Sequence, residues 1–256
     1  MATLSRINVL GVGISAINLE QAVQEIERWI SDRERNYVNV CTVHTVMECQ
    51  NDPRLRSIVN RSGLSTPDGM PLVWLNRLHG FRHAGRVYGP DLMLALCERS
   101  ATTGHRHFFY GGAPGVADLL ARKLQERFPG MKVAGTHSPP VRPADTQEDG
   151  AVLEMIDAAH ADIVWVGLGT PKQDYWVARH RPLLSTSALI AVGAAFDFHA
   201  GLLLQAPVWM QRGGFEWLFR LSQEPRRLAF RYLVYNPLFV LEVARQLAGI
   251  TKYGLD

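Results

Sequence analysis

The chain has 256 residues, 47% of them hydrophobic, and a formal net charge of +3. This length allows one large α/β domain or two small ones, and the apolar content is sufficient for a core, which excludes a disordered protein. The charge is mild overall, but basic residues become denser toward the C-terminus. That asymmetry indicates an anionic surface as a partner, and we expect no nucleic acid to bind.

The cysteines Cys41, Cys49 and Cys97 are odd in number and lack the spacing of a metal site. We interpret them as reduced, mostly buried thiols of a cytosolic protein. The N-terminus has no charged region followed by an apolar stretch, and no apolar run approaches the roughly 18 residues that a membrane-spanning helix needs. The expected protein is therefore cytoplasmic, without a secretion signal or a transmembrane segment.

The first predicted unit is a strand followed by a helix. Ile7–Ile14 has the apolar character of a strand, and Asn18 with Gln21 predicts a capping box for the next helix. Gly11–Ala16 matches the dinucleotide-binding fingerprint by its letters. Its glycines lie inside the predicted strand, however, and the helix cap comes only at Asn18, so the context that this fingerprint requires is missing.

A second strand is predicted at Tyr37–Val43, with Thr42 and His44 near its carboxyl end, and a helix is expected from Met47 to Asn60. Side chains at the carboxyl end of a strand in an open α/β sheet face the edge where ligands bind. His44 is therefore either a structural histidine or part of a site.

Leu64–Met70 is predicted to be a turn, and it contains Asp68. The turn is either purely structural, or Asp68 serves as a general base at the edge of the sheet. Tyr88–Met93 opens a helix with Pro90 at or near its first position. Arg86 comes just before this helix, where it can meet an anion or simply remain solvated.

A further strand–turn–helix unit follows. His107–Tyr110 is a predicted strand, Gly111–Gly115 a glycine-rich turn, and the next helix runs through Phe128 before a short strand from Val133. Such a turn can bind phosphate through backbone N–H groups. It lacks the residues of a P-loop, which excludes that class of nucleotide site.

Ala151–His160 predicts a helix that leads into Ile163–Val166, a strand without polar alternation and therefore buried on both faces. We expect Thr170 at the N-cap of the next helix, Pro171 at its first position and Gln173 at its third, which would form a capping box. The free N–H groups of such a helix start can hold an anion.

The segment Leu189–Gly201 begins with another buried strand that has a glycine exit, and Asp197 and His199 follow that strand. The repeated strand, glycine turn and helix predict an α/β fold with a Rossmann-like, mostly parallel sheet flanked by helices. The chain contains no D-x-D sequence, which argues against a carboxylate-bound Mg²⁺ or Mn²⁺. We expect neither a metal nor a cofactor.

The composition changes at Ala206, after which aromatic residues and arginines interleave on two predicted helices, broken near Pro225 and Pro237. Such helices suit a membrane interface, although they could also pack their aromatics into the core. We divide the chain into an α/β catalytic domain, 1–205, and a C-terminal helical segment, 206–256, that completes the site and contacts the membrane. The arginines expected to meet the lipid-linked acceptor or the membrane are Arg212, Arg220, Arg226, Arg227 and Arg231.

Several of these motifs occur together and in order, from about Ile7 to Tyr232, and their combination resembles the WecG/TagA/CpsF glycosyltransferase family. They are Thr66–Gly69, Arg86–Leu92, Phe109–Gly115, Val166–Gln173, Val192–Asp197 and Glu216–Arg227. The resemblance implies an enzyme that adds a sugar from a UDP donor to a polyprenyl-diphosphate-linked sugar. It would work at the cytoplasmic face of the membrane, in the assembly of teichoic acid linkage units, enterobacterial common antigen or exopolysaccharide.

The same resemblance implies the roles of individual residues. Asp68 corresponds to the proposed catalytic base, and the residues expected to bind substrate are Thr42, His44, Arg86, Gln173 and Asp197. His44 stands where the family usually has Asn, which leaves the identity of the adjacent sugar open. Asp174 stands where Glu is usual, and Gly135–Pro140 lacks a common aromatic ending.

The implied reaction suits these residue types. An acceptor hydroxyl needs a base within about 3 Å, and the departing diphosphate needs donors that stabilise its charge. In the absence of D-x-D, these donors are expected at one of two glycine turns. The candidates are Gly111 and Gly112 in one turn, and Gly169, Thr170 and Lys172 in the other.

Two other classes of function remain open at this stage. The chain could be a nucleotide-dependent oxidoreductase that uses Gly11–Ala16, or a non-enzymatic peripheral membrane protein anchored by its C-terminal segment. Binding of UDP, of NAD or of neither would separate the three classes. The sequence leaves open the donor sugar, the acceptor glycan and whether the chain forms a homo-oligomer.

Overall fold

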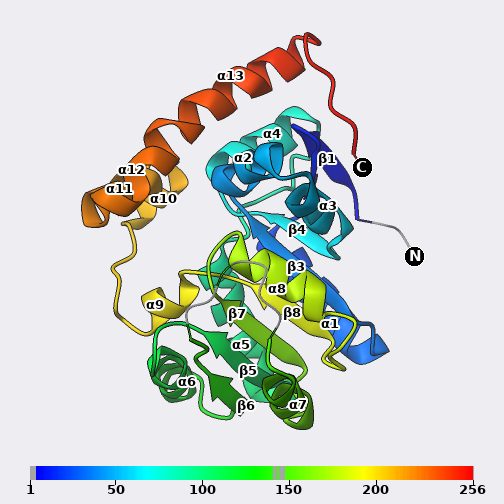
Figure 1. Ribbon diagram of the computed structural model, residues 1–256, viewed down its shortest axis with the longest axis vertical. Coiled ribbons are helices and arrows are strands. Elements are labelled where there is room, and N and C mark those ends of the chain that lie inside the picture. The colour runs from blue at the N-terminus through cyan, green and yellow to red at the C-terminus, as the bar shows by residue number, and fades with distance from the viewer. Residues whose placement is uncertain (1–3, 141–142, 144–147, 256) are drawn as a thin grey trace.

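The computed structural model describes residues 4–140, 143 and 148–255. Its centre is a six-stranded parallel sheet with the strand order β4-β3-β8-β7-β5-β6 (Figure 1). The strands are β3 (Asn36–Cys41), β4 (Leu64–Pro67), β5 (Arg106–Gly111), β6 (Lys132–His137), β7 (Ile163–Gly167) and β8 (Ala188–Ala191). The predicted Rossmann-like α/β fold is confirmed.

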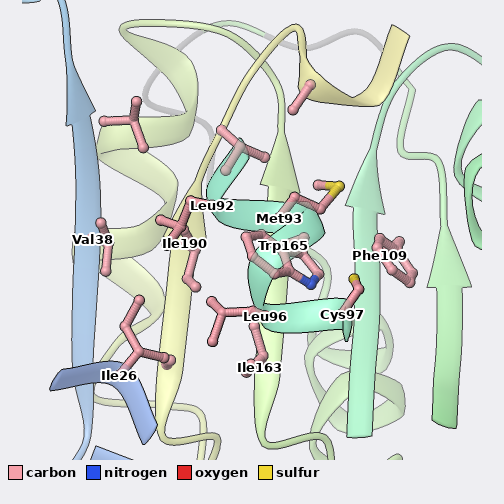
Figure 2. Packing of buried hydrophobic residues seen from close by; sticks show 14 of the residues in the cluster. Ile26, Val38, Leu92, Met93, Leu96, Cys97, Phe109, Ile163, Trp165 and Ile190 are labelled. Carbon is pink, nitrogen blue, oxygen red and sulfur yellow. The ribbon is translucent and has the colours of Figure 1, made fainter. Parts of the chain in front are cut away.

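Helices cover both faces of this sheet, because its central strands are apolar on both sides. One face packs against α1 (Leu19–Asp32), α5 (Gly89–Thr103), α6 (Val116–Arg127) and α9 (Ala195–His199). The other packs against α7 (Gly150–Ala158) and α8 (Lys172–His180). Figure 2 shows Leu92 and Leu96 of α5 against Ile163 and Trp165 of β7. The cysteines are free, buried thiols, as predicted: Cys41, Cys49 and Cys97.

The N-terminus differs from the predicted single strand. It forms an antiparallel hairpin of β1 (Arg6–Val9) and β2 (Val12–Ser15), which is a separate two-stranded sheet. Leu10 and Gly11 make the turn with φ angles of 52° and 81°, a conformation in which glycine carries no steric penalty. The predicted capping box of α1 is present. The fingerprint glycines thus lie in a hairpin, and the strand-to-helix turn required for dinucleotide binding is absent at this position.

The prediction of one helix from Met47 to Asn60 is wrong. The structure has α2 (Val43–Asn51) and α3 (Pro53–Arg61), because Asp52 caps the second helix and Pro53 starts it without a backbone N–H. The preceding strand ends at Cys41 rather than Val43, since Thr42 is the N-cap of α2. The predicted turn around Asp68 begins with a short strand, β4, and leads into α4 (Met70–Leu78).

The predicted capping box at Thr170 is also wrong. Helix α8 begins at Lys172 and Pro171 occupies the N-cap position. The Gln173 side chain instead accepts a hydrogen bond from the Gly169 N–H at 3.0 Å. The Thr170 side chain hydrogen bonds to the buried carboxyl of Asp174. The loop is therefore held by side chains that turn back toward it.

The C-terminal segment contains four helices rather than two. They are α10 (Val208–Arg212), α11 (Glu216–Gln223), α12 (Pro225–Leu233) and α13 (Tyr235–Leu247). The predicted break near Pro225 is confirmed, but Pro237 lies in the first turn of α13, where its missing N–H costs no helical hydrogen bond. In Figure 1, α13 crosses beside α2 and α4, and the tail returns to the hairpin. There the Asn8 amide donates to Tyr253 O at 2.7 Å.

Most large apolar side chains of this segment are exposed, which does not fit the alternative in which they form core. They include Val208, Trp209, Phe215, Phe230, Leu233, Val240, Leu241 and Ile250. Phe239 and Tyr232 are buried. Throughout residues 4–140, 143 and 148–255, no helix has both the length and the apolar character to cross a bilayer.

Candidate active site

A cavity of about 1130 Å³ lies between the carboxyl ends of β3 and β4 and the helices α4, α11, α12 and α13. It brings together six of the predicted site residues, which come from positions far apart in the sequence: Thr42, His44, Asp68, Arg86, Arg220 and Arg231. Parallel strands and the C-terminal helices thus converge at one edge of the sheet, where ligands of open α/β folds bind.

Asp68 follows β4 directly, and its backbone N–H donates to Cys41 O on β3 at 2.9 Å. Its Oδ1 accepts from Arg86 Nη2 at 3.1 Å. Its Oδ2 forms no hydrogen bond with any described residue. Burial raises the pKa of Asp68 to about 6, and the positive charge of Arg86 only partly offsets this. A carboxylate of this kind can accept a proton near neutral pH.

Arg86 is the centre of a polar cluster that includes the C-terminal segment. Its Nη2 lies 2.5 Å from Glu216 Oε2 on α11, and its Cζ lies 3.9 Å from the centroid of the Tyr88 ring. Tyr88 donates its hydroxyl to Glu216 Oε1 at 2.9 Å. Arg86 therefore holds Asp68 and Glu216 at once, and its own charge is largely neutralised by these two carboxylates.

Two other guanidinium groups at the cavity have no carboxylate partner among the described residues. Arg220 lies over the Phe198 ring at 5.6 Å, and Arg231 lies over the Tyr232 ring at 5.5 Å. The buried Nε of Arg231 has no hydrogen-bond partner in the described part of the chain. Burial lowers the pKa of Arg231 to about 10, so it remains charged at neutral pH. Two unpaired cations of this kind can bind a phosphate group.

Thr42 and His44 lie at the start of α2 rather than on a strand. The Thr42 hydroxyl caps the helix by accepting from the Thr45 N–H at 3.3 Å. His44 stacks on Tyr235 with 5.7 Å between ring centroids. Burial and the charge of Arg231 lower the pKa of His44 to about 3, so the imidazole is neutral. Its Nδ1 lies 3.7 Å from Glu48, but without a charge this is not an ion pair.

The two glycine turns lie side by side further along the same edge. β5 connects to β6 in one direction and β7 connects to β8 in the other, which makes the space between β5 and β7 a topological switch point. A Cβ at Gly111 would lie 2.6 Å from Gly167 O, so only glycine fits there. The N–H groups of Gly112 and Gly169 donate to Gly167 O and to the Gln173 side chain, both at 3.0 Å. Neither is therefore a free donor.

The other predicted residues of this turn and of the substrate pocket do not line the cavity. Lys172 begins α8 and is half-buried, beside the Thr170 turn. Gln173 is buried, and its side chain lies close to Gly193, beyond the end of β8. Asp197 is in α9, where burial raises its pKa and the charges of Arg227 and Arg220 oppose that rise. The charge of Arg220 lowers the pKa of both Asp68 and Asp197, so Arg220 lies near both carboxyl groups.

The remaining predicted arginines are on the surface. Arg212, Arg226 and Arg227 are exposed and do not line the cavity, and Arg227 pairs with Glu224. The five C-terminal arginines thus form two groups, of which one faces the cavity and the other faces solvent.

Sequence reasoning did not assign Glu216, Tyr88 or the apolar residues of α4 and α13 to the site. Both polar residues are part of motifs that carried the family resemblance, Glu216–Arg227 and Arg86–Leu92, so a signal was present. An acidic residue on an amphipathic helix is usually solvated, so the motif alone does not indicate a buried Glu216. The apolar residues of α13 gave no signal beyond helical periodicity.

An open parallel sheet whose carboxyl edge carries a buried carboxylate and unpaired arginines is typical of an enzyme that acts on anionic substrates. The chain belongs to the glycosyl transferase WecG/TagA/CpsF family, whose model matches residues 7–253. It is a glycosyltransferase.

Two relatives illustrate the similarity. A protein of Bacillus spizizenii is 29% identical over 198 residues, which cover 77% of this chain and 74% of the relative. A protein of Staphylococcus aureus strain MW2 is 24% identical over 251 residues, covering 97% of this chain and 96% of the relative. Both are named N-acetylglucosaminyldiphosphoundecaprenol N-acetyl-beta-D-mannosaminyltransferase.

Proposed function

We propose that this enzyme transfers a sugar from a UDP-sugar to a saccharide linked to polyprenyl diphosphate, with inversion at the anomeric carbon, in the assembly of a bacterial surface polysaccharide. The observation that carries the proposal is the cavity that joins the Asp68 carboxylate to the unpaired guanidinium groups of Arg220 and Arg231. The names of the relatives make N-acetylmannosamine the first donor sugar to test and N-acetylglucosaminyl diphosphate the first acceptor head group. Glucose is the next donor.

Asp68 is the proposed general base. Its carboxylate removes the proton from the acceptor hydroxyl, and the oxygen then bonds to the anomeric carbon while the bond from that carbon to the UDP oxygen breaks. The leaving UDP keeps the electron pair. The pKa of about 6 supports this role, because the group is ionised at neutral pH yet basic enough to hold a proton during transfer. A single displacement of this kind inverts the anomeric centre.

The departing diphosphate gains negative charge and needs positive or hydrogen-bonding groups around it. We assign this role to side chains, so that the reaction needs no metal ion. Lys172 with the Thr170 turn and the Gly111–Gly112 turn flank the switch point and are the candidates on the donor side. Because the N–H groups of Gly112 and Gly169 already have acceptors, Lys172 is the stronger donor on this side.

The 206–256 segment has two parts in this proposal. Glu216, Arg220 and Arg231 complete the site, whereas the exposed apolar residues and Arg212, Arg226 and Arg227 contact the inner face of the cytoplasmic membrane. A lipid-linked acceptor keeps its prenyl chain in the bilayer, so the site must come close to the head groups. The dinucleotide alternative has no comparable support, because its glycines form a hairpin.

The test is a transfer assay with the purified chain. UDP-N-acetylmannosamine, UDP-glucose and UDP-N-acetylglucosamine are each offered with N-acetylglucosaminyl diphosphate on a short prenyl chain, and mass spectrometry detects the disaccharide product. NMR of that product gives its anomeric configuration. We expect transfer from at least one donor with inversion. Retained configuration contradicts the single displacement, and NAD binding without UDP binding contradicts the whole proposal.

A further inference from the structure

The lining of the cavity has two chemically different parts. The polar part includes Asp68, Arg86 and Glu216. The apolar part comes from α4 and α13, and we call it the apolar channel. Its residues are Trp74, Leu75, Leu78, Val240, Val243 and Leu247. Ligand cavities are commonly about 300–1,000 Å³, so 1130 Å³ is more than a sugar and its diphosphate need.

We propose that the apolar channel binds the first isoprene units of the acceptor lipid, so that the enzyme recognises the hydrocarbon chain as well as the sugar. This inference rests on the proposed function. Without a lipid-linked acceptor, the channel has no assigned occupant. The channel is then a specific binding region on α4 and α13, and the enzyme should discriminate between acceptors by the length of their prenyl chains.

The groups that line the cavity support this assignment. The proposed acceptor consists of a sugar hydroxyl, a diphosphate and a hydrocarbon chain. The cavity offers a group suited to each part, namely the Asp68 carboxylate for the hydroxyl, Arg220 and Arg231 for the diphosphate, and the apolar channel for the hydrocarbon. The charges of Arg220 and Arg231 both interact with Asp68, which places the arginines near the carboxylate. One cavity therefore matches the three chemical parts of the acceptor.

The channel residues are apolar and partly exposed to solvent, which favours an apolar ligand. Leu78 and Val240 line the cavity but are each 66% exposed, and Leu247 is 52% exposed. Binding of a hydrocarbon to exposed apolar surface is favourable, because it removes that surface from water, and the favourable free energy is proportional to the area covered. Because these lining residues also reach solvent, a chain longer than the channel can continue past them into a bilayer.

Helix α13 is positioned independently of any ligand. Phe239 is buried in the core that contains the N-terminal hairpin, and Gln246 donates its side-chain amide to Asn8 O at 2.9 Å. Gln246 also accepts from the Leu10 N–H at 2.9 Å. One side of the channel is therefore anchored to the folded domain. A helix that is already fixed in place can bind the first part of a flexible chain with little loss of its own conformational entropy.

The experiment measures kcat/KM for a series of acceptors in lipid-free buffer, below their micelle concentrations. All carry N-acetylglucosaminyl diphosphate, and they differ only in having one, two or three isoprene units. If the channel binds the chain, kcat/KM rises roughly tenfold or more across the series, since each buried apolar carbon adds to binding. A flat series with measurable transfer overturns the channel and leaves the proposed function standing. Absence of transfer from every donor to every acceptor counts against the proposed function itself.

Two neighbouring residues provide matched variants. Val240→Gln introduces a polar group into the channel, whereas Leu241→Gln changes the next residue, which is 48% exposed and does not line the cavity. We expect Val240→Gln to reduce the gain between the shortest and the longest acceptor roughly fivefold to tenfold, and Leu241→Gln to preserve it. Equal reduction by both variants, or by neither, contradicts the assignment. Circular dichroism and the thermal midpoint establish that both variants are folded.

A binding measurement tests the channel without relying on catalysis. A farnesyl diphosphate with a photoreactive group at the end of its chain is irradiated with the protein, and the labelled peptides are mapped. We expect labels in residues 70–78 and 235–247 that an unlabelled prenyl-diphosphate sugar removes. Labels elsewhere overturn the proposal. A chain-length effect that occurs only with vesicles would show that the bilayer, and not the channel, receives the chain.

Discussion

Arg86 Nη2 lies 2.5 Å from Glu216 Oε2, which joins the loop before α5 to the first turn of α11 across a sequence separation of 130 residues. Both side chains are largely buried, and Arg86 also holds Asp68. A buried charge that loses one of its partners is costly, so this pair ties the position of the C-terminal segment to the geometry of the proposed base. The segment is part of the site wall.

This relationship makes a first prediction about Glu216→Gln. The change leaves Arg86 with one carboxylate and weakens the hydrogen bond that Tyr88 donates. We expect kcat/KM to fall roughly tenfold to a hundredfold, as a hydrogen bond to a charged group is worth about 1.5–3 kcal/mol. Limited proteolysis should cleave the 201–215 stretch faster. Glu20→Gln, which removes an exposed ion pair with Arg99 outside the cavity, should change neither measurement. Equal behaviour of the two variants would contradict this account.

The second prediction concerns Asp68→Asn. The amide preserves the shape of the side chain but cannot accept the proton, so transfer should decrease by roughly 10² to 10⁴ while the protein remains folded. Initial rates with saturating donor and acceptor measure the effect. Asp32→Asn at the exposed end of α1 is the control and should retain the wild-type rate. Wild-type turnover in folded Asp68→Asn would exclude this residue as the base.

The third prediction is a pH dependence. The base must be ionised to act, and burial raises the pKa of Asp68 to about 6. Below that value the carboxyl is protonated, so kcat/KM should decrease as the pH is lowered through about 6 and level off above it. The negative charge of Glu216 contributes to the raised pKa. In Glu216→Gln the midpoint should therefore move to lower pH. A profile without an inflection between pH 5 and about 7 would contradict the assignment.

The fourth prediction is that transfer does not require a metal ion. The Lys172 side chain is proposed to stabilise the leaving diphosphate, and it remains in place when divalent cations are removed. Activity should persist in excess EDTA within about a factor of two. Loss of activity in EDTA with recovery on adding Mg²⁺ or Mn²⁺ would assign the leaving-group chemistry to a cation. Isothermal titration of UDP with and without EDTA checks binding separately.

The fifth prediction concerns the membrane. The exposed arginines Arg212, Arg226 and Arg227 accompany the exposed apolar residues of the C-terminal segment, and each basic residue near an anionic leaflet adds about 1 kcal/mol of binding. The intact protein should float with phosphatidylglycerol vesicles at low salt and less so at moderate salt. The variant Arg212→Glu/Arg226→Glu/Arg227→Glu should float less. Arg231 is left unchanged because it lines the cavity.

Equal flotation of the variant and the intact protein would show that these arginines do not make the membrane contact. If neither floats, the segment is not a membrane-binding surface. Removal of the chain after Gln205 is a less useful test, because Phe239 and Tyr253 contact the N-terminal part of the protein and their loss would disturb the fold.

The strongest sequence predictions concerned elements whose pattern is local. Buried apolar runs such as Ile163–Val166 gave the parallel strands, and Asn18 with Gln21 gave the cap of α1. The errors arose where one residue changed the direction of the chain. Gly11 turns the first run into a hairpin, and Pro53 divides one predicted helix into two. Both residues are recognisable, but a glycine inside an apolar run is also tolerated within a strand.

The sequence by itself determined the fold class and the family, because apolar periodicity and ordered motifs are properties of neighbouring residues. Only the tertiary structure decided which charges meet. Arg220, Arg226, Arg227 and Arg231 are alike in sequence, yet two line the cavity and two face solvent, because the packing of α11 and α12 decides which side of each helix meets the cavity. The pairing of Arg86 with Glu216 likewise depends on contacts between distant segments, and no local pattern encodes such a contact.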